Sequence, residues 1–248
     1  MAWSPLLSSE EYVRQREAYG YRDPACQFII CQTGTLSCAR SFHGIYPARP
    51  PRRCPNAISL RHFEAICQEV FRDVASALDR RALSQAHEDN LVAVSCAIVH
   101  WKMASQPGRA TRSAENVRTK WNSDTAGRLI EAYLCKSIGG FRIGGVRIPT
   151  ASAFIRLLYP GEFGILDSRV AKFTEQHAIT SLSLRDDGYI NDTASNIHQF
   201  NEKYLPFLRR EAGALNAVGT TYREMAADGT EQRFPFRPCD VEMAIWQR

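Results

Sequence analysis

"FRIGGVRIPTASAFI", residues 141–155, is the stretch that decides the fold. It predicts two helices joined by a tight turn. Gly144 and Gly145 permit backbone conformations that other residues rarely adopt, and Val146 can fill the space between the helices. Pro149 suits the first turn of the second helix, where its missing N–H costs nothing. The small residues that follow allow close packing of this helix against its neighbours.

A turn of this kind presents free backbone N–H groups at a helix N-terminus, where a phosphate binds favourably. Two arginines flank the glycines, which adds positive charge at the same place. The predicted phosphate contacts of this segment are Arg142, Gly144, Gly145, Val146, Arg147 and Thr150. Glycine turns between helices are common, so the segment predicts an anion-binding helical turn and does not by itself define a function.

A second stretch, "GEFGILDSRV" at residues 161–170, places one acid among apolar residues. This acid is Asp167, and Arg169, which is a further predicted phosphate contact, follows two positions later. A buried carboxylate without a partner is unfavourable by several kcal/mol or more. Asp167 is therefore expected to be a helix cap, an ion-pair partner or a catalytic group.

Together, the two stretches resemble the helix-hairpin-helix DNA glycosylases. In that family a hairpin ending in Lys-Thr-Ala is followed by a catalytic aspartate, and the interval from Pro149 to Asp167 matches that spacing. "HWKM" at residues 100–103 and "ASAFIRLLYPGEFGILDSRV" at residues 151–170 resemble the subgroup that contains 8-oxoguanine glycosylase. The resemblance covers about residues 95–175, is faint as far as residue 246, and is absent before about residue 58.

The resemblance implies an enzyme that flips a modified base out of double-stranded DNA and hydrolyses its N-glycosidic bond. Breaking this bond builds positive charge on the sugar, and a fixed carboxylate stabilises that charge and activates water. Asp167 fits this role, with backbone N–H groups or Arg169 keeping it ionised. His100, Trp101 and Lys102 are candidates for the base pocket. Each also has a structural interpretation, as an interior histidine, a core tryptophan and a lysine that reaches solvent.

The sequence departs from the family pattern at two hairpin positions: Arg147 replaces the second glycine, and Pro149 replaces the lysine. In the family, that lysine attacks the sugar and leads to strand cleavage. Proline cannot do so, and the resemblance therefore implies a monofunctional glycosylase. Lys102 and Lys136 are alternative sources of an amine. The family's iron–sulfur cluster needs several C-terminal cysteines, and Cys239 stands alone there, so we expect no cluster and no other cofactor.

Along the whole chain the hydrophobic pattern predicts a mostly α protein. The resemblance implies a two-lobed helical fold with a cleft, formed by residues 58–248, with the hairpin at about 138–158. Residues 1–57 are expected to be an irregular arm. Apolar periodicity predicts helices from Ser59, over 90–103, 113–121, 124–138 with Asp124 as its cap, 192–215 with a kink near Pro206, and a terminal helix at 237–246 packed by Trp246. Strand-like patterns occur only at 27–32 and 230–236.

The bulk composition agrees with a DNA partner. The net charge is +5 and the pI about 8.8, and Lys and Arg outnumber the acids over both 102–128 and 136–172. A basic strip is the electrostatic footprint of phosphate binding, although a solvated basic face is an equally ordinary interpretation. We find no apolar run of membrane-spanning length and no signal peptide. We therefore expect a monomer in the cytoplasm, associated with the nucleoid, with reduced cysteines.

Other functions remain open at this stage. The alternative to a glycosylase is a DNA-binding helix-hairpin-helix module without catalysis. A zinc-dependent nuclease is a third interpretation, because Cys26, Cys31, Cys38, Cys54 and His43 lie near one another in sequence. Their spacing lacks the close pairs typical of structural zinc, so we expect no metal. The sequence does not name the modified base: the resemblance to the subgroup implies an oxidised purine, and an N-terminal arm that reaches around a bulky base would instead fit modified phage DNA. The enzyme then acts in repair or in defence.

Overall fold

The computed structural model describes residues 5–19, 60–103, 107–143, 146–226 and 228–248. Within these residues the chain is mostly helical, with a single two-stranded sheet, and this confirms the prediction of a mostly α protein. No helix in the described ranges is both long and apolar enough to cross a membrane.

The chain divides into two compact units. The first unit comprises Met1–Arg22, Arg147–Met225 and Glu231–Arg248. The second unit comprises Asp23–Val146 and Ala226–Thr230. The N-terminal residues therefore belong with the C-terminal part of the chain, and the predicted boundary near residue 57 does not separate the two units.

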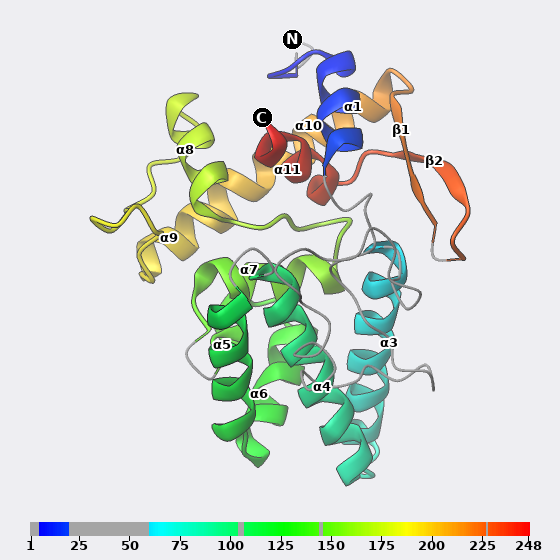
Figure 1. The fold of residues 1–248 in the computed structure, drawn as a ribbon, viewed down its shortest axis with the longest axis vertical. Helices are drawn as coiled ribbons and strands as arrows, with labels where there is room; N and C mark the ends of the chain where they lie inside the picture. The colour runs from blue at the N-terminus through cyan, green and yellow to red at the C-terminus, as the bar shows by residue number, and fades with distance from the viewer. Residues whose placement is uncertain (1–4, 20–59, 104–106, 144–145, 227) are drawn as a thin grey trace. The chain divides into compact units, whose positions relative to one another are not determined.

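The second unit is a helical bundle whose members lie side by side (Figure 1). Its elements are α3 (Leu60–Asp79), α4 (Gln85–Lys102), α5 (Pro107–Thr119), α6 (Ser123–Leu134) and the 3₁₀ helix η3 (Ile138–Phe141). The predicted apolar stripe of α3 is buried at Phe63, Cys67, Phe71 and Val74, although Leu78 is 41% exposed. As predicted, α4 is buried almost all round in its C-terminal half.

Two sequence predictions for α6 are wrong. The N-cap is Asn122 and not Asp124, because the Asn122 side chain accepts a hydrogen bond of 2.9 Å from the Thr125 N–H. The helix also ends at Leu134, since Lys136 adopts a left-handed conformation with φ of 51°. The helix expected before the glycines is the short η3. A Cβ on its Gly140 would lie 2.5 Å from the Cβ of Ala132 on α6, so these segments need a glycine there to pack.

The first unit holds the remaining elements (Figure 1). They are α1 (Ser9–Ala18), α7 (Ile148–Leu158), α8 (Ser168–Gln176), α9 (Ala194–Gln199), the π-helical turn η4 (Phe200–Tyr204), α10 (Leu205–Ala217), β1 (Thr221–Met225), β2 (Glu231–Pro235) and α11 (Pro238–Gln247). The strands pair antiparallel with Thr221 opposite Pro235. The predicted strand at 230–236 and the predicted terminal helix are both confirmed, whereas β1 was not expected.

The helix α1 corrects the expectation that residues 1–57 are irregular. Ser8 caps it by accepting a hydrogen bond from the Glu11 N–H, and Tyr12 and Arg16 are buried. The Arg16 guanidinium forms ion pairs with Glu224 at 2.8 Å and Asp240 at 3.0 Å. α1 therefore packs against α11 and β1. The predicted strand at 27–32 and the four N-terminal cysteines lie outside the described residues.

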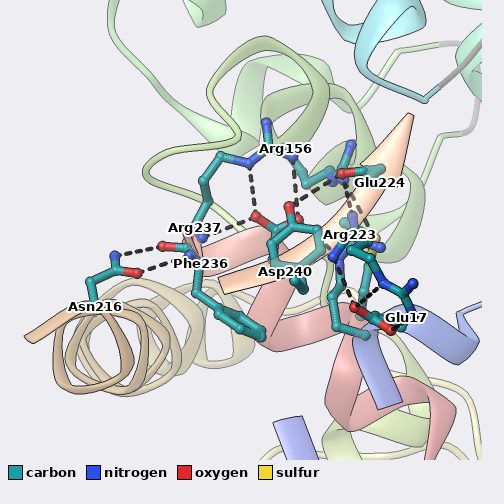
Figure 2. A network of polar contacts seen from close by, with 11 residues as sticks. Glu17, Arg156, Asn216, Arg223, Glu224, Phe236, Arg237 and Asp240 are labelled. Carbon is teal, nitrogen blue, oxygen red and sulfur yellow. Dashed lines mark hydrogen bonds and ion pairs between the residues drawn. The ribbon is translucent and has the colours of Figure 1, made fainter. Parts of the chain in front are cut away.

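A polar network joins the ends of the first unit (Figure 2). Arg237 bonds to Asp240 through its backbone N–H at 2.9 Å and its side chain at 2.8 Å. The Asn216 side chain bonds both the N–H and the carbonyl of Phe236. The ion pairs of Arg16 with Glu224 and Asp240 belong to this network and connect α1 to β1 and α11. Removing one partner of such a buried ion pair is strongly destabilising.

The predicted interruption near Pro206 is confirmed, and it takes the form of a π turn. The Leu205 N–H donates to the carbonyl of Phe200, five residues earlier. Proline has no N–H to continue the α-helical ladder, and Pro206 lies in the first turn of α10. Single π turns inside helices occur often at functional sites. This one brings Phe200 and Tyr204 into the core, with ring centroids 5.8 Å apart.

Candidate functional site

Asp167 is the N-cap of α8, as its predicted place at a helix start requires. One carboxylate oxygen, Oδ1, accepts hydrogen bonds of 3.1 Å from the N–H groups of both Arg169 and Val170. Asp167 has an extended backbone with φ of −121° and ψ of 177°, the conformation typical of an N-cap. The half-buried carboxylate therefore satisfies two of the free N–H groups at the start of α8 and lies at the positive end of the helix dipole.

The segment before Asp167 is enclosed by the first unit. The Phe163 ring stacks on Phe200, with centroids 6.4 Å apart. Gly164 has little free space around it, since a Cβ there would lie 2.5 Å from Leu208 Cδ1 and 2.9 Å from Glu242 Cβ. The expected apolar neighbours of Asp167 are therefore buried, and Leu208 of α10 and Glu242 of α11 lie close to this segment at Gly164.

Two side-chain hydroxyls bind the backbone of this segment. The Leu166 N–H donates to Ser152 Oγ at 3.0 Å, and the Tyr204 hydroxyl donates to the carbonyl of Ile165 at 2.9 Å. Burial raises the pKa of Tyr204 well above its usual value, and the carboxylates of Glu242 and Asp167 raise it further. The Tyr204 hydroxyl thus stays protonated and remains a donor.

The N-terminus of α7 is the predicted anion-binding helix end. Arg147 is its N-cap residue, but no side chain caps the helix. The Arg147 side chain is exposed, and Pro149 occupies the first turn as predicted. Thr150 is only 4% exposed, and its N–H donates to the Arg147 carbonyl at 2.9 Å. Among the described residues predicted to contact phosphate, Thr150 is therefore the least accessible.

The remaining predicted phosphate contacts are placed differently. Arg142 is half-buried and belongs to the second unit. Val146 is buried, and its N–H donates to the Ile143 carbonyl at 2.7 Å. Gly144 and Gly145 lie outside the described residues, so the tight turn itself stays a prediction.

Arg169 lies on the first turn of α8, next to Asp167. Its guanidinium carbon stands 4.4 Å from the centre of the Trp246 ring on α11. Trp246 is half-buried and also meets Tyr19 edge-on, with centroids 5.3 Å apart. This stacking orients Arg169 along the surface of the first unit and gives Trp246 a partner that the sequence did not indicate.

The predicted pocket residues lie at the end of α4 in the second unit. Trp101 is only 1% exposed and packs near Phe63, with centroids 6.5 Å apart. His100 is also buried, whereas Lys102 is half-buried. The structure favours the interpretation of Trp101 as a core residue over its role as a base-stacking surface. Asp167, Arg147, Thr150 and Arg169 belong to the first unit.

Metal-binding side chains do not gather among the residues that the structure describes, where no group of three or more His, Cys, Asp or Glu could hold an ion. Three of the four cysteines seen there are buried thiols, and Cys135 is exposed. Comparison with protein families, curated proteins and solved structures identified no match to the chain. The site is therefore interpreted from its own residues.

Ser152 and Tyr204 are site residues that the sequence did not reveal. Nothing about Ser152 distinguishes it from the small residues beside it in "TASAF". Tyr204 had an indirect signal: Pro206 sits within a helical pattern, which marks an irregular turn just before it. Both hydroxyls bind the backbone just before Asp167, whose carboxylate is fixed by its cap bonds at the start of α8.

Proposed function

We propose that the chain is a monofunctional DNA glycosylase that removes a modified base and leaves the strand intact. The observation that carries this proposal is the geometry of Asp167, whose carboxylate is held at the start of α8 within the same unit as the uncapped N-terminus of α7. A helix end that favours phosphate and a fixed carboxylate are two parts that base excision requires.

In the proposed reaction, the target base first leaves the stack, which costs a few kcal/mol. Cleavage of the N-glycosidic bond then leaves positive charge on the sugar, and Asp167 stabilises this charge and directs water to the sugar carbon. Arg147 and Arg169 neutralise phosphates on either side. The finer helix-hairpin-helix arrangement, with two lobes and a cleft that receives the base, is part of the proposal.

The absence of strand cleavage follows from Pro149. The resemblance places it where related glycosylases carry the attacking lysine, and proline in the first turn of α7 offers no amine. Lys102 and Lys136 remain the alternatives for this role. A covalent adduct trapped by borohydride on modified DNA would show that one of them attacks the sugar, whereas no adduct is expected.

A DNA-binding module without catalysis is the second candidate function. One observation favours it: the Asp167 carboxylate already has a structural use, because it caps α8. In this interpretation the α7 N-terminus and the exposed arginines bind phosphate, and no bond is broken. The glycosylase needs the negative charge of Asp167 for base release, whereas the DNA-binding module needs only its hydrogen bonds to the start of α8.

Two substitutions at Asp167 separate capping from catalysis. Serine caps helices about as well as aspartate, so Asp167→Ser should change the free energy of unfolding by less than about 1 kcal/mol. Asp167→Asn also keeps the shape of the side chain. Both variants should lower the rate of base release by about 100-fold or more, measured as alkali-labile sites in duplex DNA.

The substrates for this assay are duplexes with one modified base each, covering oxidised purines, uracil, alkylated bases and hydroxymethylated pyrimidines of the phage type. Activity on oxidised purines favours a repair enzyme, and activity on phage-type bases favours a defence enzyme. If no duplex yields alkali-labile sites, or if both Asp167 variants retain the wild-type rate, the catalytic proposal is wrong and the DNA-binding module is left.

A further inference from the structure

A single peptide group, the one between Ile165 and Leu166, is held at both of its polar atoms by side-chain hydroxyls. Its carbonyl accepts from the Tyr204 hydroxyl at 2.9 Å, and its N–H donates to Ser152 Oγ at 3.0 Å. Asp167 is the next residue. The two hydroxyls come from different elements, α7 and the π turn η4.

Both anchors have fixed orientations. Ser152 is fully buried, and its own hydroxyl proton donates to the Pro149 carbonyl at 3.0 Å, which turns an oxygen lone pair toward Leu166. Tyr204 is also fully buried, with its ring packed against Phe200. A buried peptide group must be paired. Any shift of this segment breaks at least one of these bonds, and the pairing therefore fixes the peptide plane.

Fixing this plane limits where Asp167, one residue further on, can lie. The plane fixes the Cα of Leu166, and only the two soft dihedral angles of Leu166 separate it from the peptide group that leads into Asp167. Asp167 Oδ1 must meet two N–H groups at the start of α8. The carboxylate is thus held from the α8 side by its cap and from the other side by the two hydroxyls.

We propose that Ser152 and Tyr204 are positioning residues for Asp167, and that they act as a two-hydroxyl clamp on the Ile165–Leu166 peptide group, one residue before it. The two hydroxyls fix the position of the Asp167 carboxylate whether or not the protein is an enzyme. The effect of that position on the rate of base release rests on the proposed glycosylase function. The clamp also gives the π turn a role, because the inserted residue places the Tyr204 hydroxyl on this backbone.

The first test measures the position of Asp167 without a substrate. Ser152→Ala and Tyr204→Phe each remove one hydroxyl, and the control Tyr222→Phe removes a buried hydroxyl that bonds Glu224 elsewhere in the same unit. Amide hydrogen exchange is followed at Arg169 and Val170, whose N–H groups bond to Asp167. Both clamp variants should exchange about ten-fold faster at these amides than the control. Exchange equal to that of the control overturns the clamp.

The second test measures the effect on rate. In single-turnover reactions on a duplex from which the wild type releases the base, each clamp variant should release the base about 10- to 100-fold more slowly. Its Kd for a duplex with a tetrahydrofuran abasic analogue should stay within about two-fold of wild type. The positioning role is overturned if Asp167→Asn inactivates the enzyme but Ser152→Ala and Tyr204→Phe release the base as fast as Tyr222→Phe. If the wild type releases no base from any duplex, the proposed function fails, and the amide exchange alone decides the clamp.

Discussion

Gly164 is a residue of the segment before Asp167 that leaves no room for a larger side chain. The Leu208 methyl group can rotate away from an added Cβ, but Glu242 Cβ is attached to the backbone of α11 and cannot. Gly164→Ala should therefore push the segment outward. Overpacking of this kind typically lowers the free energy of unfolding by about 1–3 kcal/mol, and here it should also slow base release because Asp167 moves.

Gly161→Ala is the matched control for this substitution. An added Cβ at Gly161 meets no atom within 4 Å, so its unfolding midpoint in denaturant and its rate of base release should stay near wild type. Equal stability of the two variants would mean that α10 and α11 yield to the extra methyl group. The close approach at Gly164 would then have no bearing on Asp167.

At the level of single residues, local chemistry was predictable and distant contacts were not. Asp167 was expected at a helix start, and its cap bonds involve residues two and three positions away. Ser152 and Tyr204 reach the same segment from 14 and 39 residues away, and periodicity within one element cannot show such contacts. Trp101 illustrates the same limit, because only packing shows whether an aromatic ring belongs to the core.

The helix α7 combines an exposed arginine with an end that lacks a side-chain cap. Arg147 has a cap-like backbone with φ of −99° and ψ of 172°, so serine at this position can cap the helix. Arg147→Ser should raise the free energy of unfolding by about 0.5–1 kcal/mol. It should also weaken DNA binding and reduce the dependence of affinity on salt by about one charge, as measured by titration at several salt concentrations.

Arg147→Ala is the control, because it removes the charge without adding a cap. It should weaken DNA binding as much as Arg147→Ser and give no gain in stability. If neither variant changes the salt dependence, then Arg147 contacts no phosphate. If Arg147→Ser gains stability and binds DNA as tightly as wild type, then the missing cap of α7 has no part in DNA binding.

The elements that the sequence predicted best carry a regular apolar stripe, as α3 does at Phe63, Cys67 and Val74. The missed elements carry buried charge instead. α1 is polar in composition, and its core contacts are Tyr12 and Arg16. An arginine looks like a surface residue until its partners are known, and those partners lie at the far end of the chain. The capping pattern of Ser8 with Glu11 was the available signal for this helix.

Across the whole first unit, three buried tyrosines share one electrostatic property. Burial raises the pKa of Tyr12, Tyr204 and Tyr222 well above the usual value near 10, and nearby carboxylates raise each pKa further. These tyrosines contact different elements but respond to pH in the same direction. The carboxylates involved are Glu11, Glu211, Glu242, Asp167, Asp240 and Glu224.

The raised pKa values predict a loss of stability at alkaline pH. Above pH about 10, the unfolded chain releases tyrosine protons that the folded protein keeps, so stability is full below that pH and falls above it. Each tyrosine lowers the free energy of unfolding by at most about 1.4 kcal/mol per pH unit, and three lower it by about 4. Denaturant titrations from pH about 8 to 11 measure how steeply the free energy of unfolding falls with pH. In Tyr222→Phe this fall should be smaller than in wild type by up to about 1.4 kcal/mol per pH unit, the contribution of one tyrosine. Tyr189→Phe is the control, because it changes a tyrosine that is 40% exposed and not one of the three buried ones. An unaltered slope in Tyr222→Phe would mean that this hydroxyl ionises as readily in the folded unit as in the unfolded chain.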